Sequence, residues 1–247
     1  KMNRLLASLA TAAVGTPMLA GVAQLPRVGA PDAPVHMHVA ARYLAGSPGE
    51  TGAENVVTGV LLDYRAFDTF GEVMIIFAAL AAVLAVLSPV AEAIGMPKDQ
   101  PSGTEHARHR RAPPVSPIVA FVLRLTAPFI IAFAVWMMLK GHLTPGGGFQ
   151  GGAMIGALLI LLSIMLERDN LWPRVPERLV RGLQAAAPLA FGVVALVGVG
   201  LTGAVLALPA SPAGHGLREL MMLTMEAGIG IGGAAIILGL FLAIRGD

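Results

Sequence analysis

The apolar stretches of this 247-residue chain are far longer than a soluble core helix requires, and they limit the fold more than any other feature. A helix needs about 20 apolar residues to cross the hydrocarbon core of a bilayer. Six segments approach that length: Leu5–Ala23, Phe70–Leu87, Pro117–Leu139, Phe149–Leu166, Ala185–Leu208 and Leu220–Ile244. With 55% hydrophobic and only 13% charged residues, the sequence predicts an all-α, polytopic membrane protein with six transmembrane helices.

The positions of lysine and arginine predict the orientation of these helices, because cytoplasmic loops carry an excess of both. If the first helix is retained, the side that includes both termini receives eleven of the seventeen basic residues. The other side receives five, and Arg124 lies inside the third segment. The first segment also resembles a signal peptide, because Lys1 and Arg4 precede it. The charge asymmetry is consistent only with a retained helix, so both termini are expected in the cytoplasm.

A polar stretch rich in proline and arginine predicts a division of the chain into two modules. We expect a two-helix module over residues 1–96, a cytoplasmic linker over residues 97–116, and a four-helix domain over residues 117–247. No internal repeat relates the two modules.

The composition also excludes several kinds of chemistry. The chain has no cysteine, so disulfides, iron–sulfur clusters and thiolate metal sites are excluded. The outer loop, residues 24–54, carries His36 and His38, but a two-residue histidine spacing indicates a metal only weakly. We therefore expect no cofactor and no tightly bound metal. The sequence gives no support for nucleic-acid binding, and it contains no nucleophile or cofactor fingerprint of a free-standing enzyme.

A string of ionisable residues, Asp63, Arg65, Asp68 and Glu72, runs into the second apolar segment. Charge at a bilayer boundary is costly and usually has a function. Asp68 and Glu72 are four residues apart, so on a helix they share one face, where two carboxylates bind a cation or pass a proton. The residues leave a structural alternative open, in which Thr69 and Glu72 form a capping box, or Asp68 caps the helix, and Arg65 pairs with Asp68.

A glycine-rich turn joins the third and fourth apolar segments. Its three consecutive glycines permit backbone angles that other residues avoid, and Pro145 fixes the chain just before them. We expect the turn to dip into the bundle, with Lys140 and His142 at its mouth, where histidine titrates near neutral pH. The expected structural residues of the loop are Pro145, Gly146, Gly147, Gly148 and Phe149. The alternative is a plain helical hairpin with a snorkelling Lys140.

Glu226 lies inside the sixth apolar segment and is followed by a stripe of glycines. A glutamate in hydrocarbon serves either as a proton carrier or as a neutral hydrogen-bond donor to a neighbouring helix, and the residues leave both open. Small residues let helices approach closely, so the stripe is expected to pack against another subunit. Its members are Gly228, Gly230, Gly232 and Gly233.

Two motifs carry a resemblance to a known family. The stretch from Asn55 to Glu72, with its core Asp-Tyr-Arg-Ala-Phe-Asp-Thr-Phe-Gly-Glu, resembles the C-terminal signature of the large A-type polypeptide of Mrp-type multisubunit Na+/H+ antiporters. It is also similar to the small E-type polypeptide of membrane-bound hydrogenases. The second half, with Gly141-His142 and the run from Pro145 to Phe149, resembles the B-type polypeptide of the same antiporters. The two modules stand in the order expected of a natural fusion.

The resemblance implies an integral subunit of a monovalent cation/proton antiporter complex in a bacterial or archaeal cell membrane, with no catalytic centre of its own. Such a complex is related to the membrane arm of respiratory complex I. The implied partners are large antiporter-like subunits and small membrane subunits of the same complex, together with the cation, protons and lipid. No lysine lies inside the six apolar segments, so this chain is not expected to carry a full proton path alone.

The resemblance also implies roles for particular residues. It places Asp68 and Glu72 on or near the cation route, and it implies that Pro145 and Phe149 matter for activity. The candidate ion and proton pathway comprises Asp63, Arg65, Asp68, Glu72, Lys140, His142 and Glu226. Two alternatives stay open: a membrane subunit of a redox-driven relative such as a membrane-bound hydrogenase, and a purely structural scaffold.

Overall fold

The computed structural model describes residues 2–87, 116–165, 177–209 and 215–245, which form helices and connecting turns without a strand among them. The all-α prediction is confirmed. Four of the described helices are long and apolar enough to cross a membrane, or five if one bent pair counts as a single span. The chain divides into two compact units, one ending at Ala45 and the other beginning at Gly46. The predicted linker lies outside the described residues apart from its last one.

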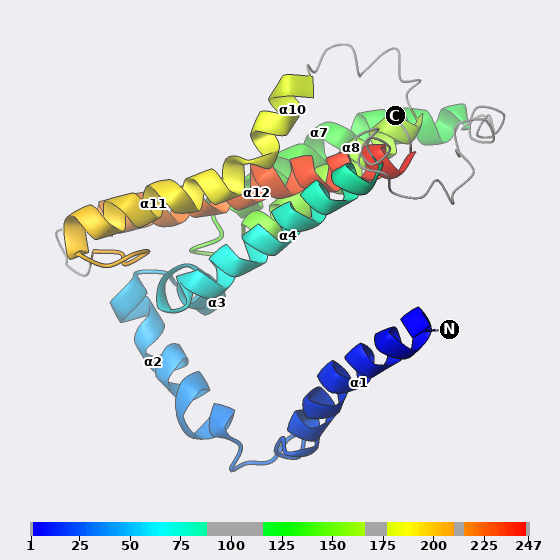
Figure 1. Ribbon diagram of the computed structural model, residues 1–247. Helices are drawn as coiled ribbons and strands as arrows, with labels where there is room; N and C mark the ends of the chain where they lie inside the picture. The colour runs from blue at the N-terminus through cyan, green and yellow to red at the C-terminus, as the bar shows by residue number, and fades with distance from the viewer. Residues whose placement is uncertain (1, 88–115, 166–176, 210–214, 246–247) are drawn as a thin grey trace. The chain divides into compact units, whose positions relative to one another are not determined.

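The first unit contains the N-terminal helices. α1 covers Met2–Ala23, and a π-helical turn, η1, covers Val35–Val39. α2, Ala40–Thr51, begins in this unit and ends in the next (Figure 1). The apolar part of α1, Ser8–Ala23, is shorter than the other candidate spans. The helix predicted over Leu5–Ala23 is therefore present, while its crossing of a membrane stays a prediction.

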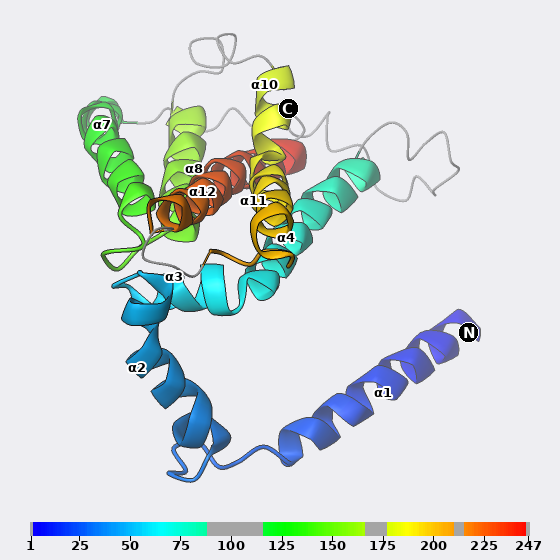
Figure 2. The same ribbon diagram turned by 90° about the vertical axis from the view of Figure 1, so that its left-hand side faces the viewer.

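α12, His215–Arg245, is the central helix of the second unit. It packs against α8 (Gly148–Met165), α11 (Ala186–Thr202) and α4 (Ala66–Leu87), as Figures 1 and 2 show. α7, Pro117–Leu139, packs mainly on α8. A 31-residue helix is about 46 Å long, so α12 exceeds the thickness of the hydrocarbon core.

The core of the second unit lies where α12, α11 and α4 meet the turns that precede α4. Phe191 of α11 is fully buried, and its ring centroid lies 5.9 Å from that of Phe70 on α4. Met222 and Met225 of α12 fill the space beside them, as flexible thioether side chains do in irregular cores. The core therefore joins both predicted modules into one packed unit.

Glycines bring α12 close to its neighbours. A Cβ atom at Gly152 of α8 would stand 2.6 Å from the Gly230 carbonyl oxygen of α12, and one at Gly232 would stand 2.9 Å from the Ala187 nitrogen of α11. The expectation that the stripe packs against another subunit is wrong for these positions, because it packs against helices of the same chain. A Cβ at Gly233 would meet no atom within 4 Å.

α11 ends earlier than the sequence predicted. The expected span continued to Leu208, but the helix ends at Thr202, and Gly203 follows with a φ of 77°. A glycine in the left-handed region is a common helix stop, because it has no Cβ to clash. The chain then folds back, which buries Leu206 and Leu208. The short helix α10, Glu177–Gln184, precedes α11 at a bend of 48°.

Two short helical turns lead into α4. α3 covers Val56–Gly59 and the π-helical turn η2 covers Val60–Tyr64. Gly59 packs against the end of α2, where a Cβ would stand 2.8 Å from the Thr51 hydroxyl oxygen. The hydroxyl of Thr69 on α4 donates to the Leu61 carbonyl at 2.7 Å. This contact fixes the angle at which α4 leaves the turns.

Substitution of two adjacent glycines tests the close approach of α12 to α11. Gly232→Ala is expected to lower the free energy of unfolding by about 1–3 kcal/mol, because its methyl group overlaps the α11 backbone. Gly233→Ala adds the same methyl group in open space, so it is expected to be neutral or to stabilise by up to about 1 kcal/mol. Thermal unfolding of both variants in one detergent measures the difference. Equal losses at both positions would contradict the packing described here.

Candidate functional site

A glycine loop, residues 140–147, joins α7 to α8. Gly146 and Gly147 have φ angles of 148° and 138°, which residues with a side chain rarely adopt. Gly148 begins α8, and Phe149 packs against the core of the second unit. The prediction that the glycines adopt unusual backbone angles is confirmed for the first two of the three.

The carboxylate of Glu226 lies inside the glycine loop. Its Oε2 accepts a hydrogen bond from the backbone N–H of Gly148, at the N-terminus of α8, where the helix dipole favours negative charge. The side chain of Thr58 also bonds to this carboxylate. Cβ atoms at Gly141, Gly147 and Gly148 would each stand 3.0 Å from a carboxylate oxygen. The glycines therefore leave the space that Glu226 fills, and only 5% of that residue is exposed.

Asn55 and Thr58 fasten the glycine loop to the N-terminal half of the second unit. The side-chain oxygen of Asn55 caps α3, while its Nδ2 donates to the carbonyls of Gly141 at 2.7 Å and Thr144 at 3.0 Å. The Thr58 hydroxyl donates to the same Gly141 carbonyl at 2.8 Å. The backbone N–H of Asn55 donates to the His142 carbonyl at 3.0 Å. Four hydrogen bonds thus hold one short stretch of loop.

His142 lies deeper than the sequence predicted. Lys140 is exposed, as expected of a residue at the mouth of the loop, but only 3% of His142 is exposed. Its Nε2 lies 3.2 Å from Oε1 of Glu219, a contact that is an ion pair when the imidazole is protonated. Among the described residues neither ring nitrogen has a hydrogen bond of good geometry. The backbone bond to Asn55 explains why the loop draws this side chain inwards.

A second polar cluster joins the start of α12 to the turns before α4. Arg218 forms an ion pair with Asp63, with 2.7 Å between Nη2 and Oδ2, and it donates to the backbone carbonyl of Glu50. The Tyr64 hydroxyl donates to the Glu50 carboxylate at 2.6 Å. Burial raises the pKa of the Asp63 carboxyl above its ordinary value, and the Arg218 guanidinium opposes that rise. Asp63 therefore serves the packing of α12 rather than an open path.

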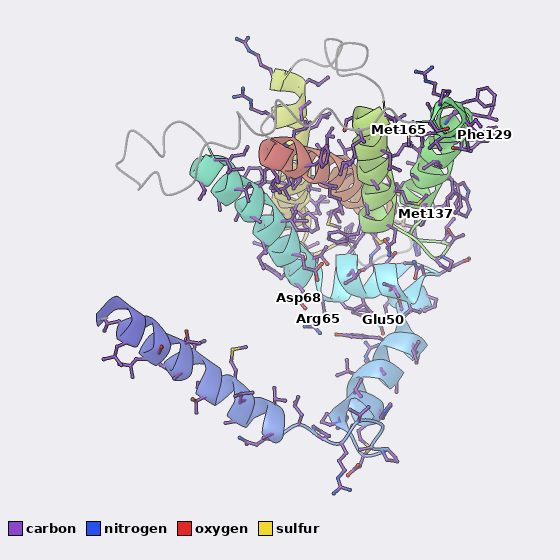
Figure 3. The ribbon with its side chains drawn as sticks, turned by 90° about the vertical axis from the view of Figure 1, so that its right-hand side faces the viewer. Glu50, Arg65, Asp68, Phe129, Met137 and Met165 are labelled. Atoms are coloured by element: carbon purple, nitrogen blue, oxygen red, sulfur yellow. The ribbon has the colours of Figure 1, made fainter. Side chains whose placement is uncertain are left out.

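The outer acidic pair, Asp68 and Glu72, faces away from the rest of the second unit. Both residues are exposed, and Arg65 forms an ion pair with Asp68 at the start of α4 (Figure 3). The capping alternatives are wrong, because α4 begins at Ala66, which places Asp68 and Thr69 inside its first turns. The expected pairing of Arg65 with Asp68 is confirmed.

The candidate pathway residues thus lie in three places rather than in one cluster. Glu226 and His142 belong to the glycine loop, Asp63 belongs to the cluster around Arg218, and the remaining acidic residues face outwards. Sequence analysis did not identify the roles of four residues, Asn55, Thr58, Arg218 and Glu219. One signal was available, because Glu219 precedes Glu226 by seven residues and so lies near the same helix face.

Fold and site together define a multi-pass membrane protein of a prokaryotic cell, with a buried glutamate held by a glycine loop. The chain belongs to the family described as the domain related to the MnhB subunit of Na+/H+ antiporter, whose model matches residues 118–244. A second family model, MbhE of the membrane-bound hydrogenase MBH, matches residues 9–101. The resemblance to a fusion of these two modules, stated from the motifs, is confirmed.

Three curated relatives have similar sequences. An uncharacterized protein of Methanocaldococcus jannaschii is 28% identical over 60% of this chain and 58% of its own length. A probable A/B polypeptide of a K+/H+ antiporter of Rhizobium meliloti is 29% identical over 52% of this chain and 14% of its own length. The B polypeptide of an Na+/H+ antiporter from Alkalihalophilus pseudofirmus is 29% identical over 32% of this chain and 51% of its own length. The chain covers less than two thirds of each relative.

Two solved structures have a similar fold. A chain of the membrane-bound sulfane sulfur reductase, an archaeal respiratory membrane complex, is 26% identical with a TM-score of 0.62, covering 99% of this chain and 98% of that one. A chain of the Mrp complex from Dietzia sp. DQ12-45-1b is 23% identical with a TM-score of 0.59, covering 100% of this chain and 26% of that one. The second likeness concerns the fold alone.

The substitution Asn55→Asp tests the attachment of the glycine loop. An aspartate still caps α3, but it donates nothing to the carbonyls of Gly141 and Thr144 and it repels them. With about 0.5–1.5 kcal/mol lost per hydrogen bond, we expect clearly faster hydrogen exchange in the peptide covering residues 140–148. Thr224→Val is the control, because the Thr224 hydroxyl bonds to Leu220 of its own helix at 2.7 Å. Unchanged exchange in the Asn55 variant would show that these bonds do not hold the loop.

Proposed function

We propose that this chain is an integral subunit of an Mrp-like monovalent cation/proton antiporter complex, with no catalytic centre of its own. The observation that carries the proposal is the buried carboxylate of Glu226 inside a candidate span, received by three glycines and the first N–H of α8. A burial this costly is retained in membrane helices chiefly for ion or proton transfer. The names of two curated relatives support the transport class.

The surroundings of Glu226 suit a group that alternates between two protonation states. The Gly148 N–H and the Thr58 side chain bond to its charged form, whereas burial away from water favours its neutral form. Neither influence acts alone, so a proton is able to bind and leave. In this role Glu226 is the inner carboxylate of the protein.

The outer acidic pair forms the second station of the proposed path. Glu72 is exposed on α4 and has the apolar neighbour Ile75, which is 70% exposed. A carboxylate facing lipid at this depth is costly, so we propose that a partner subunit covers this face. Asp68 and Glu72 then accept the cation or proton at the interface between subunits, and Arg65 tunes their proton affinity.

The proposed topology follows the arrangement expected from the charges. Six helices cross the membrane, both termini lie in the cytoplasm, and a linker over residues 97–116 joins the modules of residues 1–96 and 117–247. Lys140 and the glycine loop then lie on the outer side. The distribution of lysine and arginine supports this orientation.

A redox-driven complex is the second candidate function. The chain of the sulfane sulfur reductase complex matches this one over nearly its whole length in both directions, as a fused chain of the same size would. In such a complex the carboxylates would serve ion movement driven by electron transfer in other subunits. The absence of cysteine leaves any iron–sulfur cluster to those subunits.

Exchange measurements test the two stations. Glu226→Gln and Glu72→Gln keep the size of each side chain but remove its charge, so each is expected to reduce cation-dependent proton exchange about tenfold or more in vesicles. Glu54→Gln, at an exposed carboxylate outside the helices, is the control and is expected to exchange normally. Assembly is checked by copurification. Normal exchange in either station variant would remove that carboxylate from the path.

Purification in mild detergent separates the two candidate functions. We expect large antiporter-like chains and small membrane subunits to copurify with this chain, because the exposed apolar faces of α4 and α7 need protein or lipid to cover them. Identification of the copurifying chains by mass spectrometry gives the result. Metalloproteins in stoichiometric amount would favour the redox-driven complex over the antiporter.

A further inference from the structure

Two glutamates of α12 mark the ends of a short passage from the surface to the buried carboxylate. Glu219 and Glu226 are seven residues apart, so they lie near one face of the helix and about 10 Å apart along its axis. The Glu219 side chain is 54% exposed, whereas only 5% of Glu226 is exposed. A proton cannot cross that distance in one step, so a group between them is required.

The glycine loop places an imidazole beside the outer end of this passage. Nε2 of His142 lies 3.2 Å from Glu219 Oε1, and among the described residues its Nδ1 has no hydrogen-bond partner. The preceding residue, Gly141, lies against Glu226, where a Cβ would stand 3.0 Å from Oε1. Adjacent residues of one loop therefore contact the outer and the inner glutamate. Asn55 and Thr58 hold the backbone between them in place.

We propose that Glu219 and His142 form a proton relay between the membrane surface and Glu226, an inference that rests on the proposed proton-carrying role of Glu226. A proton from Glu219 binds to Nε2, and the proton on Nδ1 leaves towards Glu226. The imidazole is neutral before and after the step but has changed tautomer, and ring rotation or proton return restores it. A water molecule or side-chain rotation completes the inner step. The Glu219 carboxylate recovers its proton from the aqueous side.

The other charged groups near this passage are accounted for. Arg218, next to Glu219, pairs with Asp63 and the Glu50 carbonyl. Lys140 is exposed at the start of the loop, and His215 is exposed at the start of α12. A purely structural role for His142 would require only its size and one polar contact with Glu219. A relay requires a group that binds and releases protons at two nitrogens.

The first test compares two variants of His142 in the intact complex, by cation-dependent proton exchange in vesicles. His142→Gln keeps a polar contact to Glu219 but does not titrate, so exchange is expected to fall about tenfold or more. His142→Ala is expected to fall as far and to recover in the presence of imidazole, which reaches the site past the half-exposed Glu219. Pyrazole has the same size but is not protonated near neutral pH, so it should restore nothing. His38→Gln, at an exposed histidine of the first unit, is the control.

The outcomes separate this inference from the function on which it rests. Wild-type exchange in His142→Gln, or equal recovery of His142→Ala with imidazole and pyrazole, would overturn the relay while leaving the antiporter role intact. A wild-type complex that shows no cation-dependent exchange would overturn the antiporter role itself. Glu219→Gln is expected to slow exchange less than His142→Gln, because water also reaches the edge of the loop. A larger loss in Glu219→Gln would contradict the proposed order of the two groups.

Discussion

The contact between the Glu226 carboxylate and the glycine loop is the interaction on which the rest of the second unit depends. A carboxylate inside a membrane helix is tolerated only where protein replaces the water that it has lost. The loop provides that replacement with a backbone N–H at the start of α8 and with three positions that lack a side chain. Because the carboxylate occupies the loop, α12 has to lie beside α7 and α8, and the glycine contacts along α8 follow from that position.

The same loop also joins the two halves of the chain. Asn55 and Thr58 belong to the segment that resembles the tail of the large antiporter polypeptide, while the carbonyls they bind belong to the domain related to the MnhB subunit. The bonds link residues more than 80 positions apart in sequence, so they make the surroundings of Glu226 a joint product of both modules. This arrangement gives a physical reason for fusing them, since a covalent link keeps the donors beside the loop.

The charged residues at the start of α4 divide according to which side of the helix they occupy. Asp63 faces inwards and pairs with Arg218, whereas Asp68 and Glu72 face outwards with exposed apolar residues around them. An isolated helical surface of this kind is incomplete, because neither lipid nor water suits a mixture of carboxylates and large apolar side chains. The described structure therefore fits one member of a larger assembly, as the multisubunit complexes of similar fold indicate.

The sequence by itself determined the helical class, the main apolar helices and the unusual backbone of the glycine loop, because hydrophobic length and glycine runs act locally. It also identified Glu226 and the loop as separate features. Only the tertiary structure decided that they touch, that Asn55 and Thr58 clamp the loop, and that the glycine stripe of α12 packs within the chain. Residues 78 and 86 positions apart meet there, and no local pattern records which distant backbone group will satisfy a buried polar atom.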